Sequence, residues 1–173
     1  ITVADRSWSG TSASGKLPAY LASDPVYGGG WFVKPNDMGV IARLWDPTVM
    51  DRLIALYAAL AARYDGHPNV EGVVLGETSP GFNATTPGYS RYTLAVQLKR
   101  QISAVRSSWP RSNVFMYTNS LVGELQGIVE HAYQQKAGVG GPDVLPPPHK
   151  GIAGDRIIMG IEPGAVRDYR GLT

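Results

Sequence analysis

Apolar residues recur every three or four positions in the stretch 49–64, which predicts an amphipathic helix with one buried stripe. The stretch follows Asp46 and Pro47, an N-cap side chain and a residue suited to the first helical turn. Asp65-Gly66 ends it. The stripe comprises Val49, Met50, Leu53, Leu56, Tyr57, Leu60 and Tyr64.

Two further helices are expected downstream. One runs from about residue 90 to residue 108 and cannot pass Pro110. The other runs from residue 121 to about residue 135, where Ser120 can act as its cap. Short, continuous apolar runs alternate with these helices and predict buried strands at 1–4, 70–76, 114–117, 138–140 and 156–161. Strands of this kind alternating with helices predict a parallel sheet covered by helices.

Residues 7–45 do not fit this alternation. The segment is rich in Gly, Ser, Pro and aromatic residues and has little helical period. We expect a long irregular loop, of the kind that is more often functional than idle in a compact domain. The rest of the chain needs no second domain, so residues 1–173 are interpreted as a single domain.

Polar side chains follow the carboxyl end of each predicted strand: Asp5 and Arg6, Glu77, Asn119, Asp143 and Glu162. The connections at the opposite end (66–69, 109–113 and 154–155) are short. Both features are typical of a (β/α) barrel, whose active face collects the carboxyl ends of its strands. No strand is followed by a glycine-rich phosphate or dinucleotide fingerprint.

Composition narrows the function further. The chain has 173 residues, 43% apolar and 17% charged, with no cysteine and a net charge of +2. These values exclude a disordered chain, a disulfide scaffold and a cysteine-based zinc site. The three histidines have no metal-ligand spacing, so no metal or other cofactor is expected. The net charge is too small to indicate a nucleic-acid partner, and no apolar run is long enough for a membrane span. The first five residues lack a charged leader followed by an apolar stretch, so a signal peptide is not expected. The localisation stays open.

Two segments carry a resemblance. They are Tyr64-Asp65-Gly66-His67-Pro68-Asn69-Val70-Glu71-Gly72-Val73-Val74-Leu75-Gly76-Glu77-Thr78-Ser79 and Gly140-Gly141-Pro142-Asp143-Val144-Leu145-Pro146. Both segments are similar to a bacterial family of glycoside-hydrolase-like TIM barrels. The first resembles the passage into strand four of retaining glycosidases whose acid/base follows strand four and whose nucleophile follows strand seven. The resemblance implies a partial TIM barrel in which 1–4, 70–76, 114–117, 138–140 and 156–161 are strands three to seven, with strands one, two and eight missing. It implies that Glu77 is the acid/base and Glu162 the nucleophile.

The chemistry behind that assignment needs two carboxyl groups about 5–5.5 Å apart, one to protonate the leaving oxygen and one to attack the sugar. Asp5 and Arg6 can bind hydroxyls or orient Glu77, or they can simply pair with each other. Tyr117 and Asn119 can hydrogen-bond a carboxylate or a sugar, although Asn119 is also an ordinary residue before a helix. Asp143 is either a substrate contact or a turn residue.

Aromatic side chains and a histidine extend the candidate site. Trp8 and Trp31 can stack on the apolar faces of sugars, or they can hold the long loop to the barrel. The same two alternatives stand for Trp45, which lies next to a helix cap. His149 is expected in the loop after strand six, near Asp143. It allows an alternative, a serine-type esterase with Ser79 or Ser120 as nucleophile, although no G-x-S-x-G elbow is present.

The predicted function is therefore a hydrolase of the glycosidase type, acting on a carbohydrate through Glu77 and Glu162. A serine esterase acting on a small ester and a barrel fragment that binds carbohydrate without cleaving it are the alternatives. Five strands of an eight-stranded barrel leave open edges. We therefore expect a homo-oligomer in which copies of the chain cover the open sheet.

Overall fold

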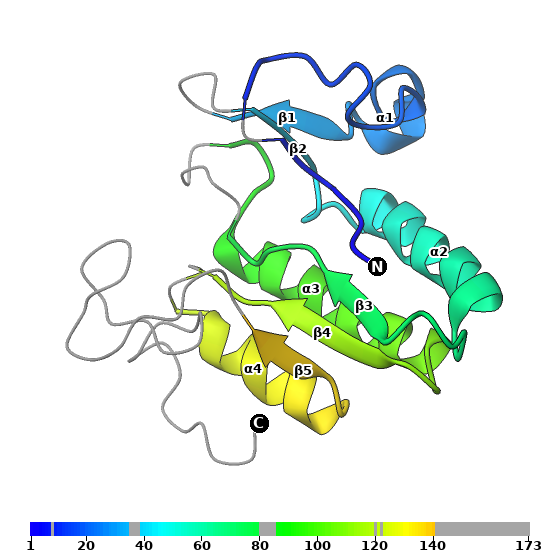
Figure 1. The fold of residues 1–173 in the computed structure, drawn as a ribbon. Helices are drawn as coiled ribbons and strands as arrows, with labels where there is room; N and C mark the ends of the chain where they lie inside the picture. The colour runs from blue at the N-terminus through cyan, green and yellow to red at the C-terminus, as the bar shows by residue number, and fades with distance from the viewer. Residues whose placement is uncertain (8, 35–38, 80–85, 120, 122, 141–173) are drawn as a thin grey trace.

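The computed structural model describes residues 1–7, 9–34, 39–79, 86–119, 121 and 123–140 (Figure 1). These residues form a mixed α/β structure with four α-helices and a three-stranded parallel sheet, preceded by a small hairpin. In chain order the elements are α1 (Tyr20–Ser23), the 3-10 helix η1 (Pro25–Tyr27), β1 (Trp31–Val33), β2 (Val40–Ala42), α2 (Pro47–Tyr64), β3 (Gly72–Leu75), α3 (Arg91–Ser108), β4 (Asn113–Tyr117), α4 (Leu125–Gln134) and β5 (Gly138–Gly140).

The parallel strands stand side by side in chain order, β3-β4-β5. Val73 pairs with Val114, and Met116 pairs with Val139. The first residues of the chain run along the other side of β3, where Thr2 forms a parallel bridge with Val74. The strand expected at 1–4 is thus reduced to a single bridge. The described residues contain no closed barrel, and the strand expected at 156–161 lies outside them.

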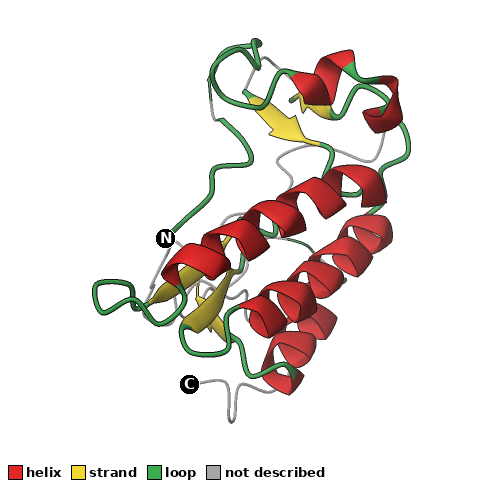
Figure 2. Cartoon of the chain, turned by 90° about the vertical axis from the view of Figure 1, so that its right-hand side faces the viewer, coloured by secondary structure: helices red, strands yellow, loops and turns green. Residues whose placement is uncertain are grey.

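Helices cover one face of this sheet. Figure 2 shows α2, α3 and α4 in a row on that face, and α3 packs against both of its neighbours. Val73, Leu75, Val114 and Met116 are buried in the core on this side. Phe115 alternates with them along β4 and is 40% exposed, because it points to the uncovered face.

The ends of α2 agree with the sequence pattern. The side chain of Asp46 accepts hydrogen bonds from the amides of Thr48 and Val49, at 2.8 and 3.4 Å, which satisfies two of the free donors at the helix start. The last helical residue is Tyr64, as expected. The prediction that Leu56 belongs to the buried stripe is wrong, since this residue is 45% exposed.

The other two long helices differ in how well their starts were predicted. Ser90 caps α3 in a reciprocal arrangement with Thr93, and the helix ends at Ser108 as expected. Helix α4 begins at Leu125 rather than at residue 121, and its N-cap, Glu124, makes no side-chain capping bond. The cap expected at Ser120 lies outside the described residues.

The segment 7–45 is more regular than predicted. It contains α1, η1 and an antiparallel hairpin in which Trp31, Phe32 and Val33 pair with Ala42, Ile41 and Val40. Arg6 forms an antiparallel bridge with Ile41, so the start of the chain contacts the hairpin after it leaves β3. The prediction of a wholly irregular loop is wrong, because strands of three residues are too short to show a period in sequence.

Candidate functional site

The loops that follow β3 and β4 are tied together at the carboxyl edge of the sheet. The amide of Thr78 donates to the carbonyl of Tyr117 at 3.0 Å. The hydroxyl of Thr78 accepts from the amide of Asn119 at 2.8 Å and donates to the carbonyl of Asn119. Thr78 is fully buried, so these bonds fix the spacing between the two loops.

This link places Glu77 beside Asn119. The side-chain amide of Asn119 donates to Oε1 of Glu77. Both residues lie two positions beyond the last residue of their strands, as expected for polar groups gathered at one edge of a parallel sheet. The side chain of Glu77 is 12% exposed, so its carboxylate is held but still reaches the surface.

Arg6 joins the start of the chain to the same cluster. Its Nε donates to Oδ1 of Asp5 at 2.6 Å, and its Nη2 donates to the carbonyl of Glu77 at 2.7 Å. Its Nη1 donates to the carbonyl of Ser79 and lies 3.8 Å from Oε2 of Glu77. Asp5 and Arg6 therefore pair with each other, and Arg6 also contacts the main chain and the carboxylate of Glu77.

Gly76 makes room for this arrangement. A Cβ atom at position 76 would lie 2.3 Å from Oδ2 of Asp5, closer than any real contact. Gly76 does not have a positive φ, so its backbone does not require a glycine. A residue without a side chain is needed here because the Asp5 carboxylate approaches the end of β3 so closely.

Sequence reasoning missed Lys34. It follows β1, is only 2% exposed, and donates its backbone amide to the carbonyl of Gly39 at 2.8 Å. Burial, and then the charge of Arg6, lower the pKa of Lys34, while the charges of Glu77 and Asp5 act in the opposite direction. The hairpin therefore contributes a buried amine to the electrostatic surroundings of Glu77. A lysine after a three-residue strand is ordinarily solvated, so no local pattern indicated this position.

The remaining expected site residues divide into two groups. Tyr117 ends β4 and Trp31 begins β1, where it packs against the hydrophobic core. That packing favours the structural alternative for Trp31, in which it holds the segment 7–45 in place. The others, Trp8, Asp143, His149 and Glu162, lie outside the described residues, as does Ser120.

The histidines that the structure describes lie elsewhere. The ring of His67 accepts the amide of Asn69 at 3.2 Å in the turn before β3. His131 of α4 shares a hydrogen bond of 2.8 Å with the hydroxyl of Ser103 in α3. Ser103 lies in the middle of a helix whose amides bond within the helix, so no backbone donors are left beside it to stabilise an oxyanion.

Two chemical properties of the described residues bear on function. They contain no group of three or more His, Asp or Glu side chains that could hold a metal ion. The polar cluster at the sheet edge consists instead of two carboxylates, a guanidinium, an amine and an amide, which can bind hydroxyl groups and transfer protons.

None of the helices in this part of the chain is both long and apolar enough to cross a membrane.

Comparison of the chain with models of protein families, with curated proteins and with solved structures gives no match.

Proposed function

We propose that this chain is a hydrolase of the glycosidase type, built on part of a (β/α) barrel, with Glu77 as its acid/base. The observation that carries the proposal is the Glu77 carboxylate, which Asn119 and Arg6 hold at the carboxyl edge of a parallel sheet. This edge is where barrel enzymes place catalytic groups. A barrel segment also accounts for strands that are parallel and stand in chain order with helices on one face.

The second half of the proposal concerns Glu162. In a retaining mechanism one carboxylic acid protonates the glycosidic oxygen while a carboxylate attacks the sugar carbon and forms a covalent intermediate. Glu77 then takes a proton from the water that hydrolyses this intermediate. The proposal assigns the attack to Glu162, which requires residues 156–161 to extend the parallel sheet beyond β5.

The proposal gives the neighbours of Glu77 supporting roles. Asn119 fixes one carboxylate oxygen, and Arg6 fixes the backbone of the same residue. Preorganised polar groups of this kind lower the cost of reaching a productive geometry. Asp5 acts through Arg6, so we regard it as a positioning residue rather than a catalytic one.

The test is turnover of a panel of aryl glycosides by the wild type and by Glu77→Gln and Glu77→Ala variants. We expect turnover to fall by at least about 100-fold, the contribution typical of general acid–base catalysis. Azide should restore turnover of Glu77→Ala and yield a glycosyl azide, because azide attacks the covalent intermediate without a general base. Glu71→Gln is the matched control, since Glu71 is exposed and precedes the same strand at its other end.

Full turnover by Glu77→Gln would refute the catalytic role. If carbohydrate binds by calorimetry and no glycoside is cleaved, the chain is a binding module instead. The described residues give no observation that favours a serine esterase, whose histidine would be His149.

We also propose that copies of the chain associate. Phe115 is 40% exposed on the uncovered face of the sheet, and a partner that covers this face would bury its ring. Light scattering should give a mass of at least two chains of 18.6 kDa, and the mass of one well-folded chain would contradict this proposal.

A further inference from the structure

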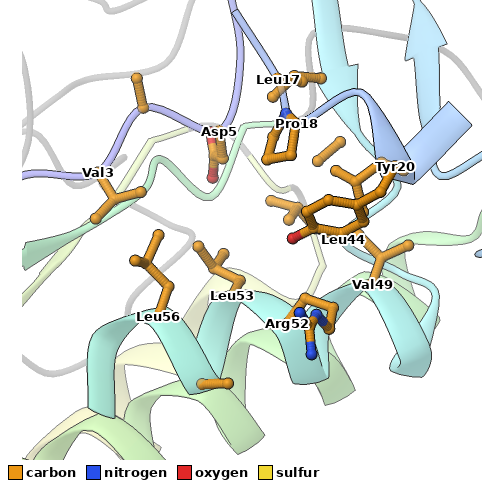
Figure 3. A pocket seen from close by; sticks show the side chains of 14 residues that line it. Val3, Asp5, Leu17, Pro18, Tyr20, Leu44, Val49, Arg52, Leu53 and Leu56 are labelled. Carbon is orange, nitrogen blue, oxygen red and sulfur yellow. The ribbon is translucent and has the colours of Figure 1, made fainter. Parts of the chain in front are cut away.

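A cavity of about 380 Å³ lies between α2 and the segments that precede it. Its walls come from the start of the chain, from the stretch around α1, from the end of the hairpin and from the first half of α2 (Figure 3). The lining is mainly aliphatic and includes Val3, Leu17, Leu44, Val49, Leu53 and Leu56. The volume lies within the range of pockets that enclose small molecules, and such pockets combine an apolar lining with a few polar groups.

Two charged side chains line the cavity, Asp5 and Arg52, and only Asp5 has a partner of opposite charge among the described residues. Asp5 is already paired with Arg6 through bonds of 2.6 and 3.3 Å, so it does not call for a further cation. Arg52 lies against the ring of Tyr20, with 5.4 Å between its guanidinium carbon and the ring centre. Among the described residues no carboxylate lies within 4.0 Å of Arg52. The cavity therefore has a cation on its wall that lacks an acidic partner in this part of the chain.

We propose that this cavity binds a small carboxylic acid with an apolar body, whose carboxylate pairs with Arg52. A guanidinium matches the two oxygens of a carboxylate better than any other side chain does, through two parallel hydrogen bonds. The apolar body of the ligand covers the aliphatic lining, including Leu56, which is 45% exposed. Burial of such surface supplies the remainder of the affinity.

Apart from Asp5, which borders both, this site and the proposed glycosidase site consist of different residues. The cavity lies against α2, whereas Glu77 and Asn119 lie beyond the ends of β3 and β4 and do not line the cavity. Asp5 is shared, but its carboxylate is already held by Arg6. Glu77→Gln should therefore leave binding in the cavity unchanged, so failure of one proposal does not entail failure of the other.

The experiment is calorimetric titration of the full chain with octanoate and with octanamide, its uncharged analogue of the same size. We expect octanoate to bind at least about 10-fold more tightly, a difference of about 1.4 kcal/mol. Arg52→Gln should remove this preference. Arg63→Gln is the matched control, because Arg63 is on the same helix and lies 5.4 Å from the ring centre of Tyr64 in the same kind of contact.

A second variant tests the location. Leu53→Trp places a larger side chain in the cavity and should abolish binding of both compounds, while circular dichroism verifies that the variant is folded. Equal affinity for acid and amide, an equal effect of Arg63→Gln, or retained binding by folded Leu53→Trp would overturn the proposal. No binding by the folded wild type at millimolar concentration would also overturn it. So would an affinity for octanoate that falls as the protein concentration is raised, because a second copy of the chain would then occupy the cavity.

Discussion

Replacing Gly76 with alanine should destabilise the protein by displacing a carboxylate. The new Cβ would lie 2.3 Å from Oδ2 of Asp5 and 3.0 Å from its Cγ. An ordinary contact begins near 3.4 Å, so the carboxylate must shift by about 1 Å. The bonds from Arg6 to Asp5 are 2.6 and 3.3 Å long, and such a shift breaks at least one of them.

The expected loss follows from the burial of this pair. Asp5 and Arg6 are only 6% and 7% exposed, so a broken bond is not replaced by water. A hydrogen bond that involves charged groups contributes about 1.5–3 kcal/mol. We therefore expect the free energy of unfolding to fall by about 2 kcal/mol in Gly76→Ala, measured by urea denaturation and followed by tryptophan fluorescence and circular dichroism.

A double-mutant cycle separates this cause from backbone strain. In an Asp5→Ala background the new methyl group occupies space that the carboxylate has left, so Gly76→Ala should cost almost nothing there. The coupling energy should be about 2 kcal/mol, within the range for residues in contact. Gly140→Ala in β5 is the control, because a Cβ there meets no atom within 4 Å. An equal cost of Gly76→Ala with and without Asp5 would refute the explanation.

Two other substitutions test local interactions. Asp46→Ala should lower the free energy of unfolding by about 1 kcal/mol because the cap of α2 is lost. Asp46→Ser should lose much less stability, because serine can also cap a helix, and equal losses in the two variants would contradict the capping role. Burial alone would raise the pKa of Asp65, but hydrogen bonds from Ser112 and Arg111 outweigh it and lower that pKa below 3.8. The stabilisation is therefore complete above the pKa of the unfolded chain and is lost as the pH falls through the native value. Asp65→Asn should be less stable than the wild type at pH 7 by a margin that closes in acid, and a margin independent of pH would contradict this assignment.

The parts of the fold that sequence could predict are those with local signals. Helix α2 combines a cap, a proline and a long periodic stripe, and its bounds agree with the prediction. β4 and β5 are continuous apolar or glycine-rich runs between turns and lie where they were expected. The hairpin escaped prediction because each of its strands has only three residues, too few to show a period, even though Pro35, Asn36, Asp37 and Gly39 stand between them in the sequence.

The candidate site shows the same division. Glu77 and Asn119 could be found because strand ends in a parallel sheet share one edge. The contact of Arg6 with the loop after β3 joins residues 71 and 73 positions apart, and no sequence spacing encodes it. The burial of Lys34 depends on how the hairpin packs against the rest of the chain, so it could be found only in the three-dimensional structure.

The central claim is that two glutamate carboxyl groups converge over one pocket. The most direct test is a crystal structure of the full chain that gives the distance between the carboxyl groups of Glu77 and Glu162. The account predicts about 5–5.5 Å, the separation that a retaining mechanism requires. Carboxyl groups that point away from each other, or a Glu162 buried beneath the sheet, would contradict it.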